Sequence, residues 1–179
     1  FLHNLSPRLQ CTIPAWFRAR NFMLKKSTKY ERIEETIFHN SKEEYIMENC
    51  IFCKIANGEI PSATLYEDEE FRVILDLGPA SKGHALILPK VHAANIYELP
   101  DATAGKAMIL AKHMAEKLTN ALECDGFNIV QNNGEIAGQT VFHFHMHLIP
   151  RYQGDGVELT WKPGSLTDED RDEILAKLK

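Results

Sequence analysis

The apolar positions after residue 50 follow two different spacings along the chain. Short runs of β-branched and aromatic residues, and one wholly apolar run stopped by a proline, are typical of strands. Between Asp101 and Leu122 the apolar residues recur every three or four positions, which predicts one long amphipathic helix with Asp101 as its N-cap. We expect strands at 63–67, 71–75, 85–88, 127–131 and 141–150, and shorter helical segments at 50–55, 95–99 and 167–179.

This order of elements predicts an α+β domain, in which a largely antiparallel sheet packs against one long helix and several short ones. The length of 179 residues favours a single domain with a substantial core. The stripe of the long helix expected to face that core consists of Ala104, Met108, Ala111, Ala115, Leu118 and Leu122.

The first 46 residues differ from the rest in composition, with six Lys or Arg by Lys29 and no acidic residue before Glu31. We interpret residues 1–46 as an N-terminal extension outside the fold, and residues 47–179 as the domain with a C-terminal tail. A basic targeting presequence would have this composition. An upstream translated or artificial extension is the favoured alternative, because patterned sequence begins directly at Met47.

Charge and composition exclude several classes of partner. Residues 47–179 carry 12 Lys and Arg against 20 Asp and Glu, so phosphate neutralisation along a nucleic acid is not expected. No apolar run approaches the roughly 18–20 residues that span a bilayer, so no membrane partner is expected. Four cysteines are too sparse for a disulfide scaffold, and no secretory signal is evident. We therefore expect a cytoplasmic protein, or an organellar one if residues 1–46 are a presequence.

Three histidines, His143, His145 and His147, alternate with apolar residues in the run His-Phe-His-Met-His-Leu-Ile. Because successive side chains of a strand point to opposite faces, the three imidazoles are expected on one face and the apolar side chains on the other. A lone histidine in a strand is usually structural. Three in strict alternation are difficult to assign to packing, because buried imidazoles are costly without partners.

Two kinds of chemistry suit three such imidazoles. They could bind a catalytic zinc ion with an open position, or one could act as a nucleophile while its neighbours stabilise phosphoryl charge. The segment Gly138-Gln139-Thr140-Val141, directly before the histidines, offers a flexible glycine, an amide, a hydroxyl and backbone N–H groups. Such groups suit phosphate oxygens and favour phosphorus chemistry.

The pair Cys50-x-x-Cys53 is a second candidate site. A redox pair is expected at a helix start after a strand, and no such strand is evident before Cys50. Zinc binding is favoured, and a pair of buried thiols remains an alternative.

The run from His143 to Ile149 resembles the motif of the histidine triad (HIT) family, His-apolar-His-apolar-His followed by two apolar residues. The resemblance extends from about residue 50 to residue 151. It is greatest to the nucleotide-binding, phosphoramidate-hydrolysing branch in its bacterial Cys-x-x-Cys form. Further matching segments, in the order of the family, are Cys50-Ile-Phe-Cys53, Gly58-Glu59-Ile60-Pro61, Asp76, Gly83-His84, Pro89-Lys90-Val91-His92, Asn132-Asn133-Gly134 and Gly138-Gln139-Thr140.

This resemblance implies a role for each matching residue. His145 would attack the α-phosphorus of a nucleoside 5′-phosphate derivative and form a covalent nucleotidyl-histidine, which water then hydrolyses. His147 would contact phosphate, and His84 would help to hold the histidine cluster. Asp76 would accept hydrogen bonds from ribose hydroxyls. The contacts to the phosphate and the leaving group would come from Asn132, Gly138, Gln139 and Thr140.

The resemblance also implies a cofactor and an assembly. In the bacterial members, Cys50, Cys53, His92 and His143 would form a closed Cys₂His₂ zinc site with a structural role. No metal would be needed for the attack itself. A homodimer is implied, with the long helix and a neighbouring strand at its interface, as is a purine mononucleotide or nucleoside phosphoramidate as the ligand.

Two other functions remain open at this point. The pocket could serve a nucleotide-sensing or scaffolding protein whose hydrolysis is incidental. The chain could also be a dinucleoside polyphosphate hydrolase, like the other branch of the family.

Overall fold

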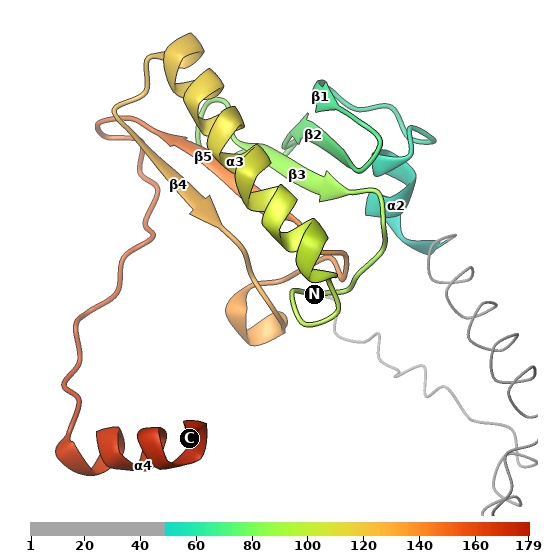
Figure 1. Ribbon diagram of the computed structural model, residues 1–179. Coiled ribbons are helices and arrows are strands. Elements are labelled where there is room, and N and C mark those ends of the chain that lie inside the picture. Colours follow the sequence, from blue (N-terminus) through green and yellow to red (C-terminus); the bar gives the residue numbers. More distant parts are fainter. Residues whose placement is uncertain (1–48) are drawn as a thin grey trace, which may run out of the picture. The chain divides into compact units, whose positions relative to one another are not determined.

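The computed structural model describes residues 49–179, and the expected extension at residues 1–46 lies outside that range. Five strands form one antiparallel sheet in the order β1-β2-β3-β5-β4 (Figure 1). The strands are β1 (Thr64–Glu67), β2 (Phe71–Leu75), β3 (Ala85–Pro89), β4 (Gly126–Val130) and β5 (Met146–Arg151). The helices are α2 (Ile51–Ala56), α3 (Asp101–Leu122) and α4 (Asp168–Leu178), and Glu135–Ala137 forms a 3₁₀ turn.

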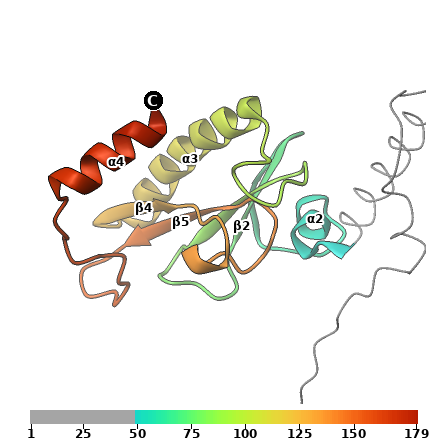
Figure 2. The ribbon, with the colours of Figure 1, turned by 90° about the horizontal axis from the view of Figure 1, so that it is seen from below.

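Two helices cover opposite faces of the sheet, so the predicted α+β class is confirmed (Figures 1 and 2). Residues of β3 alternate between the two faces, because strand side chains have a period of two. Ala85 and Ile87 belong to the larger core under α3, whereas Leu86 and Leu88 pack with Ala56 of α2. The sheet therefore separates a large core on the α3 face from a smaller one on the α2 face.

The long helix has the predicted bounds, but its cap and its buried stripe differ from the prediction. Asp101 is the first helical residue, and Pro100 is the N-cap, without a side-chain hydrogen bond. Asp101 still places a negative charge in the first turn, which is favourable beside the helix dipole. Met108 is 54% exposed. Apolar spacings of three and four residues are compatible with two neighbouring faces of this helix. The face that packs against the sheet contains Ala107, Leu110, Ala111, Met114 and Leu118.

Two other expected elements are shorter or absent. The expected helical segment at 95–99 consists of bends and turns. There the Asn95 side chain accepts a hydrogen bond from the Tyr97 N–H, a local bond that is typical of turns and competes with helix formation. The expected strand at 141–150 begins only at Met146. Of the helices that the structure describes, none is long and apolar enough to cross a membrane.

Candidate functional site

The histidine run lies at the start of β5, on the face of the sheet that α2 covers. His147 is paired in the ladder with Leu86, a residue of the smaller core. His143 and His145 precede the strand, in a segment anchored by the Phe144 N–H, which donates to the Ala93 carbonyl at 2.6 Å. The intervening apolar residues Phe144, Met146 and Leu148 belong to the core under α3, as the alternation predicts.

His145 is buried, with 5% of its surface exposed, and its two ring nitrogens have different environments. Nδ1 lies 2.6 Å from the His143 carbonyl oxygen. A carbonyl can only accept, so Nδ1 carries the proton and Nε2 keeps an unprotonated lone pair. Burial lowers the pKa of His145 below its usual value. These two effects together present Nε2 as a neutral nucleophile.

A chain of hydrogen bonds sets the protonation of His84 and His147. The Ala80 N–H donates to His84 Nδ1 at 3.0 Å, so neutral His84 carries its proton on Nε2. His84 Nε2 lies 2.9 Å from His147 Nδ1 and donates to it. His147 therefore carries its own proton on Nε2, which is left to donate to a ligand.

Burial and neighbouring imidazoles keep this chain neutral. Burial first, and then the charges that His145 and His84 would carry, lower the pKa of His147 to about 4. Burial also lowers the pKa of His84, against an opposing effect of Asp76. Near neutral pH, His147 is therefore an uncharged N–H donor.

Asp76 directly follows β2 and lies beside His84, next to the ring nitrogen that does not face His147. Its Oδ2 lies 3.6 Å from His84 Nδ1, and its Oδ1 accepts from the Gly78 N–H at 2.9 Å. Polar atoms of Asp76, His84 and His147 all lie within 4.8 Å of one another. The carboxylate is 22% exposed, so it remains accessible to a ligand hydroxyl.

Gln139, for which the resemblance implied a phosphate or leaving-group contact, has its side chain hydrogen-bonded within the protein. Its side chain is buried, and its amide nitrogen donates to the carbonyls of Ala94 and Val141 at 2.6 and 3.1 Å. Its Oε1 accepts from the Gly134 N–H at 2.8 Å. Both N–H groups of this side chain are thus used within the protein, and neither is left for a phosphate oxygen.

Other groups of the same loop are available to an anion. Asn132 and Gly138 lie close together in the structure. A Cβ atom added at Gly138 would be 3.5 Å from Asn132 Nδ2. Gly138 and Thr140 are exposed and Asn132 is half-buried. The N–H groups of Thr140 and Val141 have no carbonyl partner among residues 49–179. Such unpaired donors beside a glycine suit phosphate oxygens.

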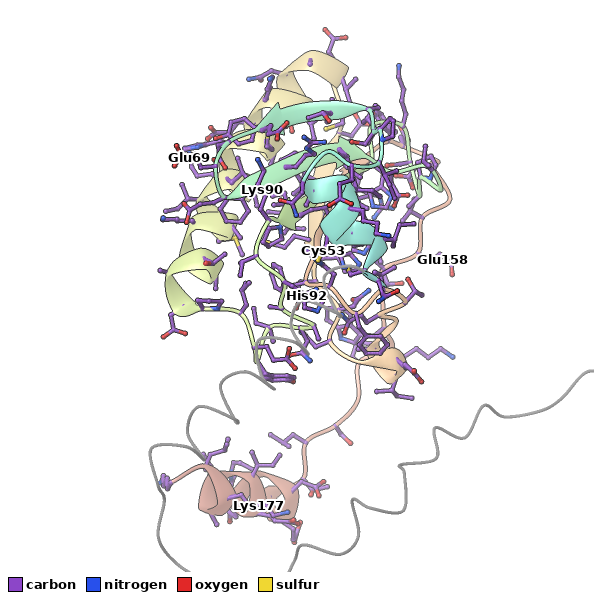
Figure 3. All side chains as sticks on the ribbon, turned by 90° about the vertical axis from the view of Figure 1, so that its right-hand side faces the viewer. Cys53, Glu69, Lys90, His92, Glu158 and Lys177 are labelled. Atoms are coloured by element: carbon purple, nitrogen blue, oxygen red, sulfur yellow. The ribbon has the colours of Figure 1, made fainter. Side chains whose placement is uncertain are left out.

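Four predicted metal ligands meet at the start of α2. His143 Nδ1 lies 3.6 Å from Cys50 Sγ and 3.4 Å from Cys53 Sγ, and His92 Nδ1 lies 3.2 Å from Cys53 Sγ. Figure 3 labels Cys53 and His92, which lie close together. All four ligand atoms are within 4.8 Å of one another. Usual zinc bond lengths give S···N separations of about 3.5 Å in a tetrahedral site, so this set fits zinc.

The surroundings of the four residues also suit a metal. His143 Nε2 donates to the Pro89 carbonyl at 2.9 Å, which leaves Nδ1 unprotonated toward the thiols. Cys50 is the N-cap of α2, and hydrogen bonds from Cys53 and then His143 lower the pKa of its thiol to about 3. The same Cys50–Cys53 hydrogen bond raises the pKa of Cys53. A cation here would hold both sulfurs as thiolates.

Phe52 is a site residue that sequence reasoning missed. Its ring packs edge-on against His145, with centroids 5.0 Å apart, and lies 6.1 Å from the ring of His143. The available signal was its position between the two cysteines. Phe52 thus places the metal-ligand pair of α2 in contact with the histidine run.

Comparison with known proteins identifies the family of this chain. The profile of the HIT domain matches residues 57–154, and the chain belongs to the HIT family. The chain is 49% identical to protein hit of Bacillus subtilis over 116 residues, which cover 64% of this chain and 80% of that protein. It is 44% identical over 136 residues to adenosine 5′-monophosphoramidase HNT1 of Saccharomyces cerevisiae, with 73% of this chain and 83% of that protein covered.

Solved structures of HIT family proteins are also similar to this chain. A HIT family crystal structure from Bacillus subtilis is similar with a TM-score of 0.68 and 44% identity, over 73% of this chain and 94% of that one. A zinc-bound histidine triad family protein from Mycobacterium smegmatis is similar with a TM-score of 0.60 and 35% identity, over 74% of this chain and 96% of that one. The fold is thus that of the HIT family.

Proposed function

We propose that this chain hydrolyses nucleoside 5′-phosphoramidates or related mononucleotide derivatives, with His145 as the nucleophile. The observation that carries the proposal is the hydrogen bond from His145 Nδ1 to the His143 carbonyl, which leaves the Nε2 lone pair free. The similarity to a yeast adenosine 5′-monophosphoramidase supports the choice of substrate class.

The proposed reaction has two steps. The Nε2 lone pair of His145 forms a bond to the α-phosphorus, the bond from phosphorus to the leaving amine breaks, and the amine takes up a proton. Water then attacks the same phosphorus, the bond from phosphorus to Nε2 breaks, and a nucleoside monophosphate leaves. Splitting the displacement in this way is the usual advantage of covalent catalysis.

The neighbouring residues bind the substrate in this proposal. His147 donates its Nε2 proton to a phosphoryl oxygen, and His84 fixes the required tautomer. Asp76 accepts from ribose hydroxyls. Gln139 holds the phosphate loop in place through Ala94 and Gly134. The remaining phosphate and leaving-group contacts come from Asn132, from Thr140 and from the backbone at Gly138.

A structural zinc ion is part of the proposal. Cys50, Cys53, His92 and His143 would hold it, and it would neutralise the thiolates and join three chain segments. The zinc-bound relative from Mycobacterium smegmatis supports this choice of metal.

A homodimer is also proposed, through α3 and the edge strand β4, where Ile129 is 40% exposed. Analytical ultracentrifugation of the full chain tests this assembly. A dimer mass is expected, and a monomer mass at micromolar concentration would contradict it.

The activity is tested with His145→Ala and adenosine 5′-phosphoramidate. We expect kcat to fall at least about 1,000-fold, because no other neutral imidazole in the cluster has a free nitrogen lone pair in this arrangement. His113→Ala, an exposed histidine of α3, should retain activity within about twofold. Turnover retained by His145→Ala would overturn the proposal. A preference for dinucleoside polyphosphates in the same assay, or tight mononucleotide binding without turnover, would favour the alternative functions.

A further inference from the structure

The two cysteines of the metal-ligand set differ in their access to solvent. Cys50 is half-buried, whereas Cys53 is only 2% exposed. Cys50 is the N-cap of α2, and its Sγ accepts from the Cys53 N–H at 3.5 Å. A small reagent in solution therefore reaches the sulfur of Cys50 before that of Cys53.

The positions of the two sulfurs also suit a disulfide. They lie within 4.8 Å of each other, so modest side-chain rotations bring them to bonding distance. An accessible first thiol at a helix start, followed by a buried second thiol, lets the first react with a reagent and the second displace it. The half-buried Cys124 bonds to Thr119 and lies outside this set.

A disulfide here and a bound metal ion exclude each other. A sulfur in a disulfide no longer has the thiolate charge that binds a cation. Of the four ligands, only His92 and His143 would remain. A structural zinc site is four-coordinate, so two imidazoles do not complete it. Oxidation of the cysteine pair would therefore release the metal ion.

His143 connects the metal-ligand set to the proposed nucleophile. Its Nδ1 faces the sulfurs of Cys50 and Cys53 at 3.6 and 3.4 Å, and its backbone carbonyl accepts from His145 Nδ1 at 2.6 Å. Once the sulfurs bond to each other, the one hydrogen bond that the His143 ring keeps among residues 49–179 is that to the Pro89 carbonyl. The carbonyl that sets the tautomer of His145 would then be held less firmly.

Phe52 provides a second connection, because it lies between the two cysteines and packs against His145 with ring centroids 5.0 Å apart. The other end of α2 is anchored separately. There Arg72 Nη1 donates to the Ile55 carbonyl at 3.1 Å, and Ala56 is fully buried. A change at the sulfurs therefore acts on the start of α2, where Phe52 lies.

We propose that Cys50 and Cys53 form a site of reversible oxidation by small disulfides such as glutathione disulfide, and that their oxidation inactivates His145. The proposal rests on the metal centre and the activity proposed above. The Cys50 thiolate attacks one sulfur of the small disulfide, whose S–S bond breaks and releases a first small thiolate. The Cys53 thiolate then attacks the Cys50 sulfur, and a second small thiolate leaves. The protein loses two electrons, the small disulfide gains them, and the metal ion is released.

Zinc release from the zinc-loaded full chain tests the oxidation. We expect glutathione disulfide to release zinc stoichiometrically, as measured with a chromogenic chelator. Peptide mass spectrometry should find a disulfide between Cys50 and Cys53, and dithiothreitol with added zinc should reverse both changes. Retention of zinc throughout the treatment, or a disulfide that joins Cys50 to Cys11 or Cys124 instead, would overturn the proposal.

Two variants serve as controls for the role of Cys50. Cys50→His removes the attacking thiol but retains a zinc ligand at a half-buried position, so we expect this variant to keep its zinc in glutathione disulfide. Cys124→Ser should release zinc as the unmodified chain does. Release at the unmodified rate from Cys50→His would contradict the assignment of Cys50. The measurement on the unmodified chain does not depend on either variant.

The effect on His145 is measured in the same oxidised and reduced samples. By ¹⁵N NMR without substrate, we expect His145 to be protonated on Nδ1 in the reduced, zinc-loaded chain and to populate both tautomers after oxidation. The kcat for adenosine 5′-phosphoramidate should fall at least about tenfold on oxidation, because small displacements of a reacting group are costly. An unchanged tautomer together with an unchanged kcat would overturn the inactivation. Zinc and tautomer are both measured without substrate, so failure of the proposed activity is distinguishable from failure of the switch.

Discussion

The three histidines between residues 143 and 147 differ in what each ring nitrogen contacts. His143 donates from Nε2 to the Pro89 carbonyl and turns Nδ1 toward two thiols. His145 donates from Nδ1 and keeps Nε2 free, whereas His147 accepts on Nδ1 and keeps an Nε2 proton. Sequence alternation predicts that the three are neighbours. Their separate roles depend on carbonyls and on His84, which no spacing within the run reveals.

The protonation of His147 can be measured directly by ¹⁵N NMR of the imidazoles. At pH 7 we expect the neutral tautomer with the proton on Nε2, and a pKa of about 4. Unfolded histidine has a pKa of about 6.5, so the unfolded chain binds more protons between these values. The free energy of unfolding should therefore decrease as pH falls from about 6.5 to about 4. A titration midpoint near 6.5, or an Nδ1-protonated ring, would contradict the hydrogen-bond chain.

At the scale of elements, the prediction from sequence was best where one face of an element is buried. The helix Asp101–Leu122 and the strand Phe71–Leu75 have the predicted bounds. Within the helix, the buried stripe is displaced from the predicted one, since Met108 is exposed and Ala107, Leu110 and Met114 are buried. The strand predicted at 141–150 begins too early, because β5 starts only at Met146. Its alternation continues through His143 and His145, but the Phe144 N–H bonds to Ala93 in a loop instead of to a neighbouring strand. The alternation of apolar residues indicates which face of a segment is buried. It does not indicate whether the backbone N–H groups bond to a neighbouring strand or to a loop.

The site could be predicted at the level of residue types, and less well at the level of individual contacts. The four metal-ligand residues meet as the resemblance implied. The side-chain N–H groups of Gln139 donate to the carbonyls of Ala94 and Val141, which are partners that the sequence pattern does not indicate. Such long-range backbone partners depend on how loops far apart in sequence approach each other.

The turn before β3 requires a glycine at position 83. Gly83 has a φ of +85°, and an added Cβ would lie 2.3 Å from Leu122 Cδ1. We expect Gly83→Ala to reduce the free energy of unfolding by about 2 kcal/mol or more, from strain and overlap together. Gly105→Ala is the control, because it lies inside α3 with open space around its Cβ position. That change should stabilise the protein by about 0.5–1 kcal/mol. Urea denaturation measures both, and a neutral Gly83→Ala would contradict the packing described.

At the scale of the whole molecule, the proposed metal centre joins segments that are distant in sequence. Its ligands come from the start of α2, from the loop after β3 and from the segment before β5. Because Phe52 lies between the two cysteines and contacts His145, the centre and the proposed nucleophile share one structural support.

Removal of one ligand tests the centre. We expect Cys53→Ser to lose stoichiometric zinc and to lower Tm by about 10 °C or more, since metal binding contributes several kcal/mol of folding free energy. Cys124→Ser is the matched control, because that half-buried thiol bonds to Thr119 outside the ligand set. Elemental analysis and calorimetry give both readouts. A Cys53→Ser protein with full zinc content would contradict the ligand assignment.

The central claim is that His145 becomes covalently bonded to the nucleotide during turnover. The most direct measurement is rapid quenching of the full chain with adenosine 5′-phosphoramidate, followed by peptide mass spectrometry. We predict one adenylyl group on His145, formed at least as fast as kcat. An adduct on another residue, or turnover without any adduct on a timescale that would capture it, would contradict the claim.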